Sequence, residues 1–215
     1  DAQAKAAGNN DYLYYLDETG AKQYFKAGDM HFVDINKDGK IDEADKTIIG
    51  NPIPDIYGNI FGSVLWKHFT LTLGLNYSLG NDVYIYSRSV LESGSTFYNQ
   101  TIAMANRWRH EGQVTDMPRL SYGDPMGNAR FSDRWIEDGS YLRLKTVNIS
   151  YKVPVKGDWI QGLTIWSEAN NLFTITKYLG SDPEFSAANG VLYQGIDPGN
   201  VALSRTFTFG MKINL

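Results

Sequence analysis

The sequence Phe69-Thr-Leu-Thr-Leu-Gly-Leu-Asn-Tyr-Ser-Leu79 decides the fold. Its odd-numbered residues are large and apolar or aromatic, whereas its even-numbered residues are small or polar. Strict alternation with a period of two predicts a β-strand with one apolar and one polar face. Strands in soluble proteins have a usual length of about 5 to 6 residues, whereas strands that cross an outer membrane run about 9 to 11. The length of this stretch therefore favours a membrane strand.

The same alternation recurs along the chain, most clearly at the carboxyl end between Thr206 and Leu215. Further strands are predicted over about 56–66, 83–90, 141–153 and 163–171. Short turns, such as Lys67-His68, alternate with long polar connections over about 91–140 and 172–204. This pattern predicts an all-β fold of antiparallel up-and-down strands, typical of outer-membrane barrels. Six strands are fewer than the about 8 of the smallest membrane barrel, so in a membrane they would form one arc of a larger wall.

Composition excludes several classes of protein. The 215 residues carry 20 Lys+Arg against 24 Asp+Glu and have no dense basic run, which argues against a nucleic-acid partner. Cysteine is absent, so disulfides, thiol nucleophiles and thiolate metal sites are excluded for this sequence. No apolar stretch approaches the about 20 residues of a membrane-spanning helix. Because the sequence opens at Asp1 without a methionine or a signal segment, we expect a processed product or a fragment of a longer chain.

Residues 1 to about 30 are polar and dotted with tyrosines, and they predict a loop with a short hairpin. The stretch that follows, Asp34-Ile-Asn-Lys-Asp-Gly-Lys-Ile-Asp-Glu-Ala-Asp45, matches the template of a calcium-binding loop. The predicted ligands are Asp34, Asn36, Asp38, the backbone carbonyl of Lys40, Asp42 and Asp45. Calcium prefers six to eight oxygen ligands, and glycine at the sixth loop position permits the sharp turn. The loop therefore predicts a Ca²⁺ site.

Two features limit what this loop does. Asp45 stands where the template has glutamate, and its shorter side chain makes bidentate ligation harder. Pro52 and Pro54 stop any long helix after the loop, so it is a lone loop with a fixed structural role and not half of a paired sensor. The alternative is an Asp/Asn-Gly turn whose acids are only solvated.

Catalytic motifs are weak. Glu137, Asp182 and Glu184 could supply the paired carboxylates of a glycoside hydrolase, but the sequence names no convincing pair, and we expect no enzyme. The large aromatic residues could form membrane-interface girdles, pack in the protein or stack on sugars, and their place near strand ends favours the first two. These residues are Trp108, Trp135, Tyr141, Trp159, Trp166 and Tyr178.

Five separated segments together resemble one known family. They are Gly28-Asp29-Met-His-Phe-Val-Asp34 running on to Asp42, Thr47-Ile-Ile-Gly-Asn-Pro-Ile-Pro-Asp55, Asp138-Gly-Ser-Tyr-Leu-Arg-Leu-Lys145, Asn170-Asn-Leu-Phe-Thr174 and Asp182-Pro-Glu184. In order and spacing they resemble the carboxyl-terminal part of SusC/RagA-family TonB-dependent outer-membrane transporters of Bacteroidetes. The terminal strand also resembles that family, although Leu215 stands where such strands commonly end in phenylalanine.

The resemblance implies an arc of a large transmembrane β-barrel of about 22 strands in the outer membrane, with long extracellular loops. Residues 1–55 would form an extracellular loop region holding the calcium loop 34–45, and residues 56–215 the carboxyl-terminal strands and loops. The implied function is import of large nutrients, glycans or peptides. Implied partners are a SusD-like surface lipoprotein, TonB through an amino-terminal part outside this sequence, and outer-membrane lipid. The alternative is a soluble, secreted, calcium-stabilised β-sandwich that binds glycans.

Overall fold

The computed structural model describes residues 2–8, 11–156, 159–185, 187 and 190–215. The chain divides into two compact units. The first comprises Asp1–Ile49 and Tyr86–Trp135, and the second comprises Gly50–Ile85 and Ile136–Leu215. The predicted boundary at residue 55 divides the sequence into two consecutive segments, whereas each compact unit combines two separate segments. This boundary stays a prediction. Within the described part, no helix has the length and apolar character needed to cross a membrane.

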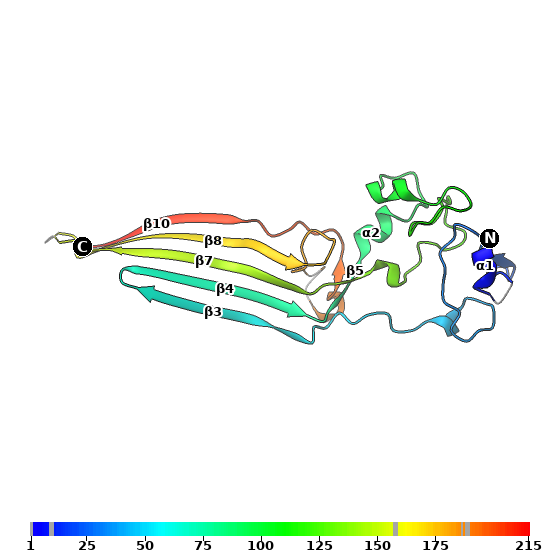
Figure 1. The fold of residues 1–215 in the computed structure, drawn as a ribbon, viewed down its shortest axis with the longest axis horizontal. Helices are drawn as coiled ribbons and strands as arrows, with labels where there is room; N and C mark the ends of the chain where they lie inside the picture. The colour runs from blue at the N-terminus through cyan, green and yellow to red at the C-terminus, as the bar shows by residue number, and fades with distance from the viewer. Residues whose placement is uncertain (1, 9–10, 157–158, 186, 188–189) are drawn as a thin grey trace. The chain divides into compact units, whose positions relative to one another are not determined.

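The second unit contains one sheet of five long antiparallel strands in the order β10-β8-β7-β4-β3 (Figure 1). The strands are β3 (Ile56–Trp66), β4 (Phe69–Leu79), β7 (Tyr141–Val153), β8 (Gly162–Thr176) and β10 (Thr206–Asn214). The predictions for β3, β4 and β7 match the observed bounds, and the predicted last strand is one residue too long. Each long strand pairs with the previous one along the chain, which confirms the antiparallel up-and-down arrangement.

Register gives the sheet two different faces. One row of paired residues across the five strands is apolar except at Ser167: Val64, Leu71, Ile149, Ser167 and Phe209. The adjacent row is polar throughout: Ser63, Thr72, Asn148, Glu168 and Thr208. The apolar face stays exposed, with Ile149 at 49% and Phe209 at 76% of full exposure. In the described part of the chain no second sheet covers this face, so the prediction of a β-sandwich, our alternative, is wrong.

The predicted strand over 83–90 is wrong beyond Ile85. β5 (Asp82–Ile85) ends there, and the helix α2 (Tyr86–Leu91) follows. The alternation stops at this point, and Arg88 pairs with Glu92 four residues later, a spacing that brings side chains together on a helix. β5 also lies outside the long sheet, between β6 (Ile136–Asp138) and β9 (Ile196–Asp197), with which it pairs antiparallel and parallel respectively. In the described part of the chain the arc therefore has five strands and not the six predicted.

β8 continues to Thr176, five residues beyond the predicted end at 171. Asn171 adopts a φ of 54° inside the strand. The pairing of β8 with β7 shifts at this point and resumes at Phe173. The asparagine pair thus marks a bulge and not the end of the strand.

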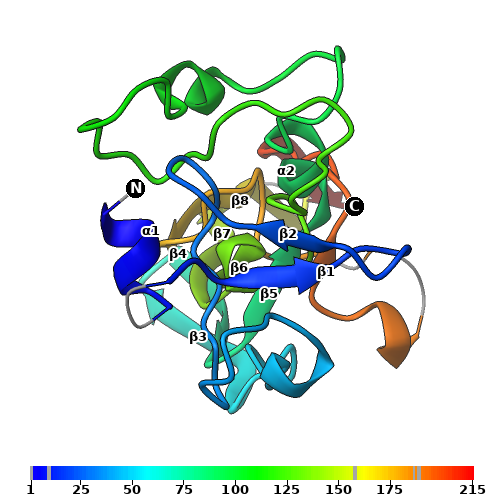
Figure 2. The same cartoon turned by 90° about the vertical axis from the view of Figure 1, so that its right-hand side faces the viewer.

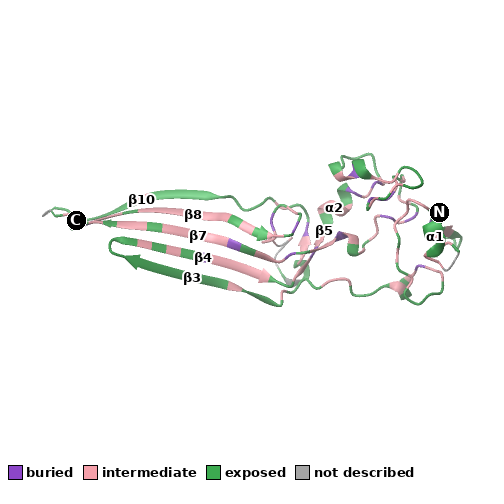
Figure 3. Ribbon diagram, viewed as in Figure 1, coloured by how far each residue is buried: buried purple, intermediate pink, exposed green. Residues whose placement is uncertain are grey.

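The outer strands of the sheet, β3 and β10, are exposed along nearly their whole length (Figure 3). Among the described residues neither strand has a partner on its outer side, so each presents an open edge of backbone groups. An antiparallel sheet with an exposed apolar face and two open edges is complete only when further strands extend it and an apolar medium covers that face.

The first unit is built mostly of loops around a small core of Leu13, Phe25, Ile41 and Met126. The predicted short hairpin is present as β1 (Tyr14–Leu16) and β2 (Lys22–Tyr24), shown in Figure 2. The helix α1 (Ala2–Ala6) was not predicted. The described residues of this unit include the short 3-10 helices η1 (Glu43–Asp45), η2 (Ile102–Asn106) and η3 (Asp133–Trp135). A fourth, η4 (Val191–Tyr193), lies in the second unit. Residues 1, 9 and 10 of the predicted loop region, and 186, 188 and 189 of the predicted loop 172–204, lie outside the described residues.

Candidate functional site

Asp34 organises the first half of the calcium-type loop. Its Oδ1 accepts hydrogen bonds from the backbone amides of Lys37 at 2.7 Å and Asp38 at 3.3 Å. Its Oδ2 accepts from the amide of Gly39 at 2.7 Å. Gly39 has a φ of 82°, a conformation that other residues rarely adopt. The glycine therefore closes the turn as predicted.

The middle of the loop is held by Asn36 and Asp38. Asn36 Oδ1 accepts from the Asp38 amide at 3.0 Å, and its Nδ2 donates to Asp38 Oδ2 at 3.0 Å. Asp38 Oδ1 accepts from the Lys40 amide at 2.8 Å. Both side chains thus partner groups within the loop.

The last two predicted ligands close the loop. Asp42 caps η1 by accepting from the Ala44 amide, and Asp45 accepts from the amides of Asp42 at 2.9 Å and Ile35 at 2.8 Å. Lys40 Nζ lies 2.6 Å from Asp42 Oδ2. This contact, together with the Ala44 amide, lowers the pKa of the Asp42 carboxyl.

Two contacts fix the loop within the first unit. The backbone of Tyr14 in the hairpin forms a parallel bridge with Lys40. Its carbonyl accepts a hydrogen bond from the Ile41 amide at 2.8 Å, and its amide donates to the Gly39 carbonyl at 3.2 Å. Ile41 is 8% exposed and belongs to the core of the unit. In the described residues no three Asp, Glu or His side chains converge as a metal-binding group. The structure therefore shows an anchored loop of oxygen donors whose carboxylates partner amides and Lys40.

Asp29 forms a second polar centre in the same unit. The sequence analysis used this residue only as part of the family motif and assigned it no contacts. Its buried carboxylate pairs with Arg119 through Nε at 2.9 Å and Nη2 at 3.0 Å, and accepts from Asn128 Nδ2 at 3.0 Å. Asn128 in turn accepts from the Met30 amide at 2.9 Å. This network ties the segment before the calcium-type loop to residues 119–128.

The acids considered for catalysis are engaged in ion pairs and backbone hydrogen bonds. Asp182 pairs with the buried guanidinium of Arg143, and Glu184 lies 2.8 Å from Lys145 Nζ. Arg143 Nη1 also lies 3.0 Å from Glu184 Oε2, a contact that is an ion pair and not a hydrogen bond. Glu137 accepts from the Leu179 amide at 3.0 Å. Their geometry fits a structural role.

Two of the aromatic residues that were predicted to form girdles or to pack in the protein, Trp135 and Tyr178, are buried. Trp135 is fully buried in the first unit and donates from Nε1 to the Arg130 carbonyl at 3.0 Å. Tyr178 is buried in the second unit, where it packs on Val83 and Ile85 and donates to Asp197. Burial and the Asp197 carboxylate raise the pKa of Tyr178. Trp159, in contrast, is 89% exposed.

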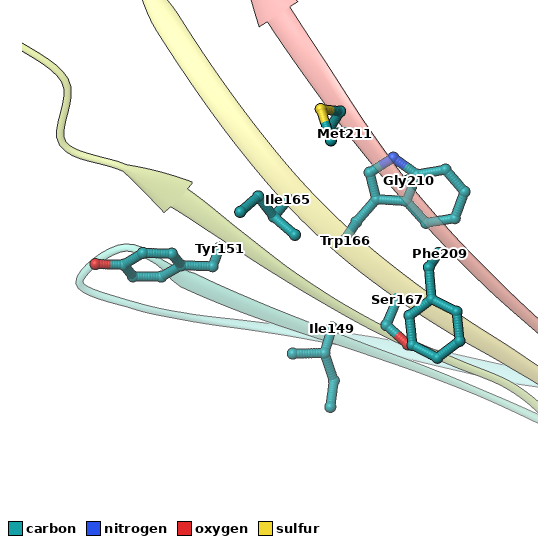
Figure 4. Close-up of a pocket in the computed structure, with 8 residues that line it drawn as sticks. All are labelled: Ile149, Tyr151, Ile165, Trp166, Ser167, Phe209, Gly210 and Met211. Carbon is teal, nitrogen blue, oxygen red and sulfur yellow. The ribbon is translucent and has the colours of Figure 1, made fainter.

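A shallow hollow of about 550 Å³ lies on the long sheet, lined by side chains of β7, β8 and β10 (Figure 4). Most of its lining is apolar and includes Ile149, Ile165 and Phe209, which share the exposed apolar face. Figure 4 also shows Trp166 of β8 beside Gly210 of β10. The hollow is therefore part of the exposed apolar face of the sheet.

Comparison with known proteins agrees with this architecture. No family model matches the chain. It is 32% identical over 190 residues to a TonB-dependent receptor of Formosa agariphila, covering 85% of this chain and 18% of that protein. It is 28% identical over 216 residues to the TonB-dependent receptor SusC of Bacteroides thetaiotaomicron, covering 96% of this chain and 19% of SusC. The chain thus spans less than a quarter of the length of these curated relatives.

Solved structures share the fold. The chain superposes on the RagAB peptide transporter with a TM-score of 0.68 at 23% identity, covering 94% of this chain and 22% of that one. The RagAB importer in its 'closed-closed' state gives a TM-score of 0.67 at 24% identity, covering 92% and 20%. The long strands, the two-faced sheet and the sequence relatives lead to one conclusion. The chain belongs to the SusC/RagA family of TonB-dependent outer-membrane transporters, and its long sheet is an arc of their β-barrel.

Proposed function

We propose that this chain is part of the wall and rim of a transporter that imports large nutrients, glycans or peptides, across the outer membrane. The observation that carries the proposal is the five-stranded antiparallel sheet, apolar on one face and polar on the other, in a chain that is 32% identical to a TonB-dependent receptor. The apolar face suits lipid, and the polar face suits a wet lumen. Relatives in this family are receptors and transporters, which supports a role without bond chemistry.

The proposal includes partners that act on the whole protein. SusC-type relatives and the RagAB assembly support a SusD-like surface lipoprotein as the lid of the transporter. The name TonB-dependent receptor supports energy from TonB, delivered through an amino-terminal part of the protein. Whether the cargo is a glycan or a peptide depends on loops and a lumen that this segment shares with the rest of the barrel.

Uptake in living cells tests this function. Cells of the source organism that lack the full-length protein should lose accumulation of one class of labelled oligosaccharide or oligopeptide, and the restored gene should return it. Cells treated with a protonophore should still bind the nutrient at the surface but should not accumulate it. Unchanged accumulation of every oligosaccharide and oligopeptide class by the deletion strain would contradict the proposal.

We also propose that residues 34–45 bind Ca²⁺ through Asp34, Asn36, Asp38, the Lys40 carbonyl, Asp42 and Asp45. The donor set supports this, because carboxylate, amide and carbonyl oxygens are the ligands calcium prefers. The closed loop and its bridge to Tyr14 hold these donors in one short segment. Binding would require Asp42 to exchange Lys40 for the cation, since the two side chains now form an ion pair. The bound ion would fix the loop to the hairpin.

Calorimetry on the full-length protein tests this site. Replacement of Asp34→Ala together with Asp38→Ala should abolish calcium binding and make the surrounding loop more sensitive to protease. Glu43→Gln is the matched control, because this side chain lies in the same loop, is 84% exposed and is outside the predicted ligand set. Calcium affinity that is equal in the double variant and the control would eliminate the site.

A further inference from the structure

The last long strand of the sheet has no short turn to set its register. β10 pairs with β8 over nine residues, but the connection between them runs from residue 177 to 205. A tight hairpin fixes register through its turn, whereas a long connection does not. Alternation excludes a slip by one residue, because such a slip exchanges the two faces. A slip by two residues leaves every side chain on its original face of the sheet, so alternation does not prevent it. Specific contacts must exclude this slip.

β8 itself offers room for such a slip. It has 15 residues against the nine of β10, so a shift toward Thr176 would leave every residue of β10 opposite a residue of β8. In the observed register Thr206 lies opposite Asn170 and Gly210 opposite Trp166. A Cβ at position 210 would lie 2.5 Å from Cζ2 of the Trp166 ring, so the indole fits over this glycine (Figure 4). After the shift Lys212 would face the ring instead.

At the end of the sheet where β10 begins, two side chains form hydrogen bonds with the backbone just before this strand. Asp182 Oδ2 accepts from the Leu203 amide at 2.9 Å, and Asn171 Nδ2 donates to the Ser204 carbonyl at 3.0 Å. Asp182 is 6% exposed and is itself held by Arg143 of β7, which is 3% exposed. Arg143 Nε also donates to Thr174 of β8 at 2.9 Å. The backbone entering β10 is therefore tied to both β7 and β8.

The pKa of Asp182 agrees with this arrangement. Burial alone would raise it, but the hydrogen bonds from Arg143 and from the amides of Leu203 and Glu184 outweigh burial and lower it. The carboxylate therefore stays charged at neutral pH. A charged acceptor makes the stronger hydrogen bond to the Leu203 amide.

We propose that Arg143, Asp182 and Asn171 form a register anchor that sets where the last barrel strand begins and prevents it from slipping by two residues along β8. Asp182 and Asn171 hold the backbone at 203–204, and Arg143 acts through Asp182 as a positioning residue. The Trp166–Gly210 contact supports the same register within the sheet.

Cysteine crosslinking in the full-length protein, assembled in the outer membrane, tests the anchor. The segment has no native cysteine. Thr206→Cys with Asn170→Cys reports the observed register, whereas Thr206→Cys with Glu168→Cys and Thr208→Cys with Asn170→Cys report the two slipped ones. A thiol reagent that spans about 5 Å joins directly opposite residues but not diagonal ones, which lie about 7 to 8 Å apart. Mass spectrometry gives the yield of each link.

We expect Asp182→Asn with Asn171→Ala to raise the slipped links at least about tenfold, as expected from losing a hydrogen bond to a charged group. Lys177→Gln, an exposed charge on the same connection, is the control and should leave the yields unchanged. Each variant is also made with Trp166→Leu, so that the ring cannot mask the effect. If the double variant fails to assemble, Asp182→Asn alone replaces it. Slipped links that stay at the parent level in both backgrounds would overturn the proposal.

Discussion

A charge on the apolar face of β4 should destabilise the barrel in proportion to its depth in the membrane. Leu73 is the fifth of eleven residues of β4 and lies opposite Gly62 and Val147 on the apolar face. Eleven residues with a rise of about 3.4 Å and a tilt of about 40° give a height of about 28 Å, close to the apolar band of about 25 Å. Leu73 therefore lies within about 3 Å of the bilayer midplane.

Leu73→Arg should lower the free energy of unfolding by about 2–4 kcal/mol, the cost of an arginine that faces lipid at the midplane. The assay is urea unfolding of the full-length protein folded into lipid vesicles, followed by gel mobility without heating. Thr72→Arg is the matched control, since the adjacent residue lies on the polar face. It should cost well under half as much, because water can solvate its charge. Equal losses for Leu73→Arg and Thr72→Arg would refute the assigned facing.

Three further predictions concern the loops. Trp135→Ala removes a fully buried indole and should destabilise the first unit by about 3–5 kcal/mol, seen as faster hydrogen exchange over residues 86–135 while the sheet is unchanged. Gly28→Ala should also destabilise this unit, because Gly28 has a φ of 85° and an added Cβ would meet the Trp108 ring; a thermal melt equal to that of Ala27→Ser would contradict this. Since the pKa of Asp182 is lowered by folding, its contribution is complete above the ordinary value of 3.8 and is lost as pH falls through the lower folded value. Urea titrations should therefore show stability falling below about pH 4, and Asp182→Asn should flatten that fall.

The sequence predicted the long strands because each carries its own periodicity. β3, β4 and β7 have the expected bounds, since alternation of apolar and polar residues persists over their whole length. The predicted bounds of β8 and β5 failed where the alternation of apolar and polar residues is interrupted. The predicted end of β8 at residue 171 coincides with a bulge at Asn171, and the strand continues beyond it. β5 ends at Ile85, where the alternation stops and α2 begins, and Arg88 and Glu92 then have the four-residue spacing of paired side chains on a helix.

The polar network at the rim could not be located from sequence. Arg143 and Asp182 lie 39 residues apart, and the fold alone brings them together. The same holds for Asp29, whose partner Arg119 is 90 residues away. The calcium-type loop differs, because all its predicted donors lie within twelve consecutive residues and local spacing defines them. The hydrogen bonds of the loop join residues within this short segment. Calcium binding by the loop stays a prediction, which calorimetry tests.

Fractionation of source cells tests the central claim most directly. An antibody against residues 28–55 reports both the membrane in which the protein resides and the mass of its polypeptide. Since this segment spans only 18% of its relative in Formosa agariphila, we expect an outer-membrane band several times heavier than the 24.1 kDa of the segment. The band should migrate faster when the sample is not heated, as a folded barrel does. A band near 24.1 kDa in the soluble or secreted fraction would contradict the assignment to the wall of an outer-membrane transporter.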